Sequence, residues 1–173
     1  MMKKDPQIEA DICKIYDLLA EDQDAKAQKA IYLIIEELKA RTQVEFTDNL
    51  FPEQSAYFLQ WGRCLELLDE PEQALLKWEK SLNFEPQSIE TLWAMASCLI
   101  YTMNKPEIAI PLLKDRLIPL DEHNEQFIDA LKASELGAMA SEDFPDFLIP
   151  PANIGEGDKF DGTINSENTN SEQ

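Results

Sequence analysis

The sequence contains few glycines, and most of them lie near one end. Of the five in 173 residues, Gly155, Gly157 and Gly162 lie beyond residue 150, which leaves Gly62 and Gly137 for the long preceding part. Glycine loses more backbone freedom in a helix than any other residue and is therefore disfavoured there. Its scarcity over residues 1–140 favours an all-α fold.

The sequence also lacks the residue patterns that most enzymes and metal sites need. His123 is the only histidine, and it stands at an expected helix start, where a solvated capping role is typical. There is no Gly-rich phosphate loop, no metal-binding spacing of His and carboxylates, and no nucleophile elbow. Cys13, Cys64 and Cys98 are too scattered for a zinc motif and odd in number for a disulfide framework. We therefore expect no catalysis, cofactor or metal, and reduced thiols.

Basic residues and long apolar runs are scarce as well. Fifteen Lys and Arg stand against 34 Asp and Glu, for a formal net charge of −19. A polyanion is repelled by nucleic acid phosphates and by anionic membranes, and no apolar run has the length of a signal peptide core or a membrane span. We expect a cytoplasmic protein that binds neither nucleic acid nor membranes, with protein ligands of apolar or basic character. An alternative is that the acidity serves solubility alone.

Apolar residues recur at helical spacing over seven segments. These are residues 6–20, 25–41, 53–68, 71–84, 88–103, 106–118 and 122–140. Pro52, Pro71 and Pro106 stand at expected helix starts, where a missing amide hydrogen costs least, and Pro86 follows an expected helix end. The sequence therefore predicts seven helices, the last of which caps the others.

Two segments depart from this helical pattern. Residues 42–52 form a long connection with several apolar side chains, which either packs on its own helices or forms one rim of a ligand groove. Residues 141–173 carry eight acidic side chains and one basic side chain, and we expect this acidic tail to be largely disordered. Within it, the apolar segment 144–151 either fastens the last helix to the body or occupies the groove as an internal ligand.

The strongest pattern is a repeat with an offset of 35 residues. Adding 35 to the numbers of nine positions mostly brings large apolar residues onto large apolar ones and small residues onto small ones. The first copy is Phe58, Trp61, Gly62, Leu65, Ala74, Trp78, Ser81, Leu82 and Pro86, and the second is Trp93, Ala96, Ser97, Ile100, Ala109, Leu113, Arg116, Leu117 and Asp121. Such a period is typical of helix pairs that bury their apolar faces by stacking.

These positions resemble the tetratricopeptide repeat (TPR) family, most closely over residues 55–88. The second copy, about 90–123, departs from the family at Arg116, where a small residue is usual, and at Asp121, where proline is usual. The resemblance implies a right-handed α-solenoid of about three helix pairs plus a C-terminal capping helix. Residues 1–41 would form a degenerate first hairpin, and residues 53–140 would hold two repeats and the cap.

In this family the first helix of each pair lines a concave groove that binds a peptide or helical segment of a partner protein. The matching positions here are Ala56, Leu59, Gln60, Arg63, Glu66, Thr91, Ala94, Met95, Cys98 and Tyr101. Leu59, Met95 and Tyr101 would be apolar anchors and Arg63 the main cation. The alternative for Leu59 and Met95 is that both belong to the core. With a single cation, the clamp that some relatives use for an acidic carboxyl terminus is disfavoured.

A narrower resemblance is to the class II chaperones of type III secretion translocators, which hold hydrophobic translocator subunits in the bacterial cytosol. It rests on length, acidity and the segments 57–59 and 96–99, together with Gly62 and Cys64. The first hairpin lacks the aromatic and glycine pattern of that family, and the connection at 42–52 is longer. The sequence thus predicts a protein-interaction module acting as adaptor or chaperone. A structural subunit of a larger assembly, or a homodimer, is the alternative.

Overall fold

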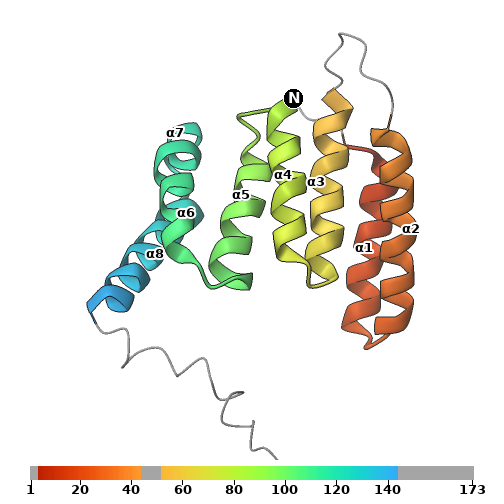
Figure 1. The fold of residues 1–173 in the computed structure, drawn as a ribbon, viewed down its shortest axis with the longest axis horizontal. Coiled ribbons are helices and arrows are strands. Elements are labelled where there is room, and N and C mark those ends of the chain that lie inside the picture. The colour runs from red at the N-terminus through yellow and green to blue at the C-terminus, as the bar shows by residue number, and fades with distance from the viewer. Residues whose placement is uncertain (1–3, 44–51, 144–173) are drawn as a thin grey trace, which may run out of the picture. The chain divides into compact units, whose positions relative to one another are not determined.

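In the computed structural model, residues 4–43 and 52–143 are described, and most of them are helical (Figure 1). The helices are α1 (Pro6–Ala20), α2 (Asp24–Thr42), α3 (Pro52–Leu67), α4 (Pro71–Phe84), α5 (Ile89–Ser97), α6 (Pro106–Leu112), α7 (Ile118–Leu120) and α8 (Glu125–Asp143). None of the described residues is in a strand. The predicted all-α fold is therefore confirmed. The expectations for residues 44–51 and 144–173 lie outside the described residues.

Two of the expected helices contain a wider, π-helical turn. Cys98–Thr102 continues α5, and Leu113–Leu117 joins α6 to α7. Pro111 and Pro119 flank the second of these turns, and neither can donate a backbone hydrogen bond. Counting these turns, each of the seven predicted helical segments is present with limits within about three residues of the predicted ones.

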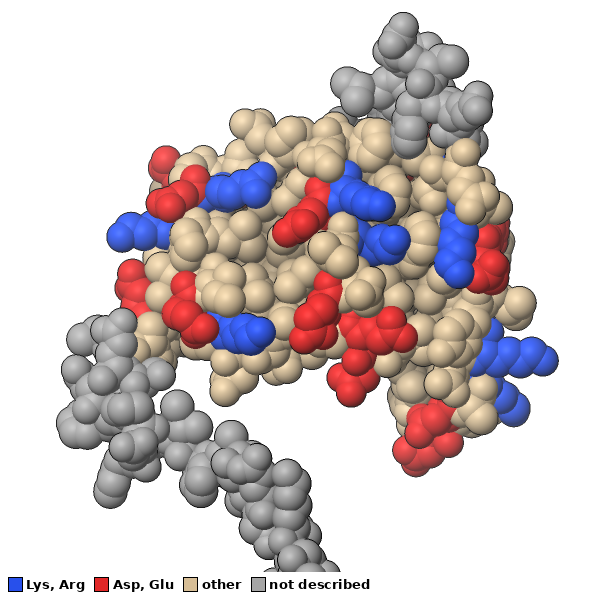
Figure 2. Space-filling model, viewed as in Figure 1, with Lys and Arg blue, Asp and Glu red and all other residues tan. Residues whose placement is uncertain are grey.

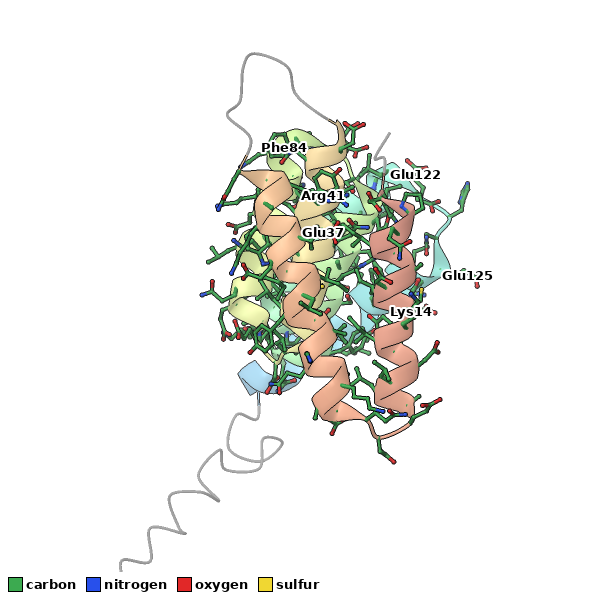
Figure 3. The ribbon with its side chains drawn as sticks, turned by 90° about the vertical axis from the view of Figure 1, so that its right-hand side faces the viewer. Lys14, Glu37, Arg41, Phe84, Glu122 and Glu125 are labelled. Atoms are coloured by element: carbon green, nitrogen blue, oxygen red, sulfur yellow. The ribbon has the colours of Figure 1, made fainter. Side chains whose placement is uncertain are left out.

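Side-chain caps and ion pairs fix the ends of the first hairpin. Asp5 Oδ1 accepts hydrogen bonds from the backbone N–H groups of Gln7, at 2.8 Å, and Ile8, at 3.1 Å, and so caps α1. Its other carboxylate oxygen accepts a hydrogen bond from Arg41 near the end of α2. Arg41 also pairs with Glu37, one turn earlier on the same helix (Figure 3). One carboxylate therefore starts α1 and ties it to α2.

The Asp5 carboxylate makes the stability of this hairpin depend on pH. The hydrogen bond from Arg41 lowers the pKa of Asp5, and the backbone N–H of Ile8 lowers it further. A lowered folded-state pKa stabilises the protein above the unfolded-state pKa of about 4, and this contribution is lost as the pH falls through the folded-state value. Because asparagine is also a good cap, Asp5→Asn removes mainly the charge.

We expect Asp5→Asn to melt below the wild type at pH 7, with a difference that shrinks below about pH 4. Thermal unfolding followed by circular dichroism measures both values. Asp17→Asn, an exposed acid on the same helix, removes the same charge as the matched control. A difference that stayed constant from pH 7 to pH 3 would show that the ion pair does not contribute.

The three hairpins close in the same way. Asp22, Asp69 and Asn104 have φ values of 56°, 60° and 53°, in the left-handed region. Asp and Asn tolerate this conformation better than other non-glycine residues. Asn104 lies 35 residues after Asp69, so the backbone conformation at the hairpin turn repeats with the sequence period.

Successive helices pack on each other along the chain. α1 contacts α2 and α3, α2 contacts α3, α3 contacts α4, α4 contacts α5, and α5 contacts α6. In Figure 1 these helices follow each other from the red to the green part of the chain. The chain divides into two compact units inside α8, after Glu135. All three hairpins belong to the first unit.

The interior of this unit consists of two apolar clusters. The first is built mainly from α1 to α4 around Trp78, which is fully buried. The second comprises residues of α5, α6 and the turn after it, together with Leu82 and the first half of α8. A chain of buried hydroxyl groups joins α3 and α4 to α5: Ser81 Oγ lies 3.0 Å from Ser55 Oγ and 3.1 Å from Thr91 Oγ1. Thr91 in turn lies 2.9 Å from Ser88.

Close helix packing in the first cluster depends on Gly62. A Cβ atom at this position would lie 2.2 Å from Nε1 and 2.6 Å from Cδ1 of Trp78. Trp78 is held in place because its Nε1 donates a hydrogen bond to the carbonyl oxygen of Leu59, at 3.1 Å. The small residue that the repeat pattern shows in α3 therefore makes room for a large indole from α4.

The first hairpin uses the same buried positions with different residue sizes. Ile8, Ile12 and Ile15 precede Phe58, Gly62 and Leu65 by 50 residues, and all six are buried. Similarly, Ala27 and Ile31 precede Ala74 and Trp78 by 47 residues, and these four are also buried. Two isoleucines thus replace the glycine and tryptophan of the second hairpin. The sequence predicts that residues 1–41 depart from the repeat. In the structure, this departure is a change in side-chain size at equivalent buried positions.

Candidate partner-binding surface

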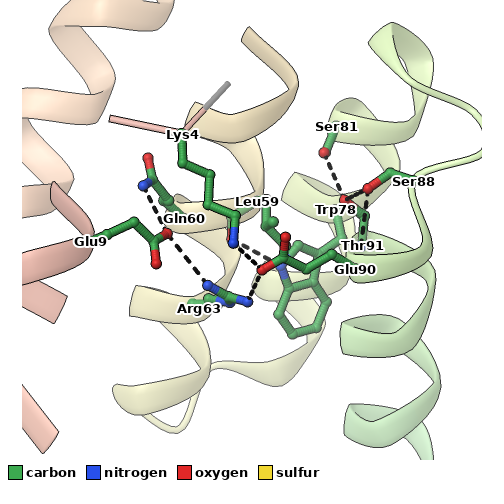
Figure 4. A network of polar contacts seen from close by, with 10 residues as sticks. All are labelled: Lys4, Glu9, Leu59, Gln60, Arg63, Trp78, Ser81, Ser88, Glu90 and Thr91. Carbon is green, nitrogen blue, oxygen red and sulfur yellow. Dashed lines mark hydrogen bonds and ion pairs between the residues drawn. The ribbon is translucent and has the colours of Figure 1, made fainter. Parts of the chain in front are cut away.

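Helices α1, α3 and α5 contribute to one network of charged side chains (Figure 4). Arg63 of α3 donates from Nη2 to Glu90 Oε1 of α5, at 2.5 Å, and its Nη1 lies 3.5 Å from Glu9 Oε1 of α1. Gln60 Nε2 donates to the same oxygen of Glu9, at 2.9 Å, and Lys4 pairs with Glu90. Residues far apart in the sequence are thereby held together on one face.

The charges in this network compensate each other. Burial raises the pKa of Glu90, but the hydrogen bond from Lys4 and the positive charge of Arg63 outweigh it, so its pKa lies below the ordinary value. The Glu90 carboxylate is therefore ionised at neutral pH. Arg63, which the sequence marks as the main cation of a groove, already has two carboxylate partners and is not free to recognise an anion.

The structure divides the ten predicted groove residues into two groups. Five of them, Ala56, Leu59, Gln60, Thr91 and Cys98, have no exposed surface. The other five, Arg63, Glu66, Ala94, Met95 and Tyr101, reach the surface. Only the second group can contact a partner without rearrangement of the helices.

Each buried member of the set has a role inside the protein. Leu59 packs in the first apolar cluster, and Thr91 belongs to the hydroxyl chain between α4 and α5. Burial raises the pKa of the Cys98 thiol to about 12, and the neighbouring Glu66 carboxylate adds to the shift. Gln60 donates to Glu9, while its buried Oε1 atom has no hydrogen-bond partner in the described part of the chain. For Leu59, the core alternative is the one that the packing favours.

The exposed part of this surface combines two tyrosines with a carboxylate. Tyr16 of α1 is 52% exposed and Tyr101, in the wide turn after α5, is 70% exposed. Glu66 of α3 accepts a hydrogen bond from Thr102 Oγ1, at 3.2 Å. Within residues 4–43 and 52–143, Glu66 has no cationic partner.

The charge of Glu66 affects the titration of Tyr16 on α1. Partial burial raises the pKa of Tyr16, the positive charge of Arg63 lowers it, and the negative charge of Glu66 raises it. Glu66 therefore has an electrostatic effect on Tyr16 of α1 and accepts a hydrogen bond from Thr102 at the end of α5. Tyrosine and an unpaired carboxylate are suited to a ligand with apolar and basic groups.

Sequence reasoning missed the contribution of α1 to this surface. The 50-residue offset that relates Ile8 to Phe58 also places Glu9, Cys13 and Tyr16 at the positions of Leu59, Arg63 and Glu66. That spacing was available in the sequence. It was obscured because Ile12 stands where the repeat has glycine.

Neither a metal site nor a membrane-spanning helix is found in the described ranges. No group of three or more His, Cys, Asp or Glu is placed there so that it could hold a metal ion. Among the same residues, no helix is sufficiently long and apolar to cross a bilayer.

Comparison with known proteins gave no match from which a function could be inferred. No family model matches the chain. No curated protein matches it at a significant level either.

Proposed function

We propose that this protein is a TPR-type interaction module that binds a segment of a partner protein on the surface formed by α1, α3 and α5. The observation that carries the proposal is the pair of exposed tyrosines, Tyr16 and Tyr101, on either side of α3, which bears the unpaired Glu66 carboxylate. The repeated hairpin turns and the shared buried positions of the hairpins support a TPR-type scaffold.

The chemistry of the surface favours a partner with apolar and basic side chains. Tyrosine provides a large contact area with little loss of side-chain freedom. Glu66 offers a carboxylate to a cation, whereas Arg63 is neutralised by Glu9 and Glu90. The net charge of −19 also attracts basic ligands over a distance. The module would serve as an adaptor or chaperone in the cytoplasm.

Affinity purification tests the proposal. Tagged protein is isolated from its native cells, and the recovered partner is identified and purified. The Tyr16→Ala/Tyr101→Ala variant is expected to bind this partner at least about tenfold more weakly, since anchor residues of an interface commonly contribute more than 1 kcal/mol each. Tyr32→Ala, which removes a tyrosine of similar exposure from α2, is the control. Equal binding by both variants would place the partner elsewhere.

A narrower form of the proposal is a class II chaperone of a type III secretion translocator. The partner would then be a hydrophobic secreted subunit. Recovery of cytosolic proteins alone would contradict this narrower form and leave the interaction module in place.

A second candidate function is that of a subunit in a homodimer or larger assembly. It is favoured by the exposure of Tyr32 and Leu33, at 50% and 65%, next to each other on α2. Size-exclusion chromatography with light scattering separates the two functions. A purified protein that remains monomeric at high concentration would contradict the homodimer.

A further inference from the structure

A second surface, formed by α2, α4 and another side of α3, places cations over aromatic rings. Lys77 Nζ of α4 lies 3.7 Å from the ring centroid of Trp61, and Lys80 Nζ lies 5.8 Å from that of Phe58. Phe58 stacks on Trp61, with centroids 6.2 Å apart, and on Phe84, with centroids 5.9 Å apart. Rings contributed by α3 and α4 are thus stacked beneath ammonium groups of α4. Basic side chains over α2 and α4 are visible in Figure 2.

Two of the three lysines at this surface lack a carboxylate partner within the described residues. Among the residues of the described helices, neither Lys77 nor Lys80 forms an ion pair with a carboxylate. Burial lowers the pKa of Lys77, and the positive charges of Lys80 and of Lys39 on α2 lower it further. Lys39 pairs with Glu36, at 2.6 Å. Like charges held this close repel each other, and a bound anion would relieve the repulsion.

We propose that Lys77 and Lys80, which lie over the rings of Trp61 and Phe58, form a docking surface for an acidic segment of a partner protein, to which Lys39 adds positive charge. Carboxylates of the segment would pair with the ammonium groups of Lys77 and Lys80, and apolar side chains between them would contact the partly buried ring of Trp61. Charge complementarity selects this occupant. A long nucleic acid is disfavoured because the protein as a whole carries a net charge of −19.

This surface is independent of the one under the proposed function. It uses α2, α4 and the aromatic side of α3, whereas the tyrosine surface uses α1, the Glu66 side of α3 and the end of α5. The two surfaces favour ligands of opposite charge. A protein with both could hold a basic segment and an acidic segment at the same time, as an adaptor must.

A synthetic peptide tests the acidic docking surface on the full chain. The probe is a fluorescein-labelled dodecapeptide of repeated Glu-Glu-Leu triplets, and binding is followed by fluorescence anisotropy at about 50 mM NaCl, where screening is weak. We expect Lys77→Gln/Lys80→Gln to weaken binding at least about fivefold, and binding to fall as salt is added. Lys26→Gln/Lys29→Gln removes the same charge elsewhere on the molecule and is expected to bind as the wild type does.

Further arms separate the proposal from its alternatives. Lys77→Arg/Lys80→Arg keeps the charge and is expected to retain binding, and Lys80→Gln alone, at an exposed position, is expected to weaken it with the fold intact. If the two double glutamine variants lost the same affinity for the peptide, the effect would come from net charge alone, and the proposal would be overturned. Absence of binding to the wild type would also overturn it, as would equally tight binding of an oligothymidylate of the same charge, which would indicate a general polyanion site.

Discussion

Replacing Gly62 with alanine is expected to lower the free energy of unfolding by about 3 kcal/mol, although the change adds a single methyl group. The added Cβ would lie 2.2 Å from Nε1 of Trp78, far inside any van der Waals contact. The indole is fully buried and cannot move without disturbing its neighbours. Any shift also weakens its hydrogen bond to the Leu59 carbonyl oxygen. Urea denaturation of both proteins measures the loss.

A double-mutant cycle identifies the cause of this loss. Trp78→Leu alone is expected to cost about 3 kcal/mol, through lost contacts and a cavity. In the Gly62→Ala/Trp78→Leu protein, the alanine methyl group occupies space that the indole has vacated. The double variant is therefore expected to lose clearly less than the sum of the two single losses. Strict additivity would show that Gly62 acts through helix propensity and not through contact with Trp78.

Replacing Leu59 with alanine is expected to lower the free energy of unfolding by about 3 kcal/mol, as for a leucine in a core. Leu59 has no exposed surface and packs in the first apolar cluster, so its truncation leaves a cavity between α3 and its neighbours. Tyr101→Ala, at another of the predicted groove positions but 70% exposed, is expected to change stability by less than about 0.5 kcal/mol.

The pair of variants separates packing from recognition. Urea denaturation measures the free energy of unfolding of each variant, and a binding assay with the purified partner measures the affinity of each. We expect Leu59→Ala to act on stability and Tyr101→Ala on affinity. If the Leu59→Ala protein were as stable as the wild type but bound the partner more weakly, Leu59 would contact the partner in the groove, as its position in the repeat predicts.

The helices could be predicted from the sequence because their signals are local. Pro6, Pro71 and Pro106 mark helix starts, and the apolar residues between these points follow the helical period. The need for a small residue at Gly62 also follows from the repeat. Its cause, the indole of Trp78 lying across the helix, becomes visible only when α3 and α4 are packed together.

The exposure of the site residues could not be predicted in the same way. The position of a residue in the repeat predicts the direction of its side chain from its own helix. It does not predict whether a neighbouring helix covers that side chain. Glu9 and Glu90 come from helices on either side of α3, and they engage Gln60 and Arg63. Ion pairs between residues 54 or 27 positions apart leave no trace in a local pattern. The lysines over Trp61 and Phe58 were missed for the same reason.

The buried hydroxyl groups of Ser55, Ser81 and Thr91 have a consequence for how the protein opens. They form a seam between α5 and the pair α3 and α4. Leu75, Met95 and Met103, each partly buried, pack against both apolar clusters. Parting the helices at this seam would expose these bridging apolar side chains, together with Leu82 of α4 and Cys98 after α5, but water could replace each broken hydroxyl contact. Amide hydrogen exchange would then report two cooperative units, with α1 to α4 in one and the helices from α5 onward in the other. The seam is thus a natural boundary for partial unfolding.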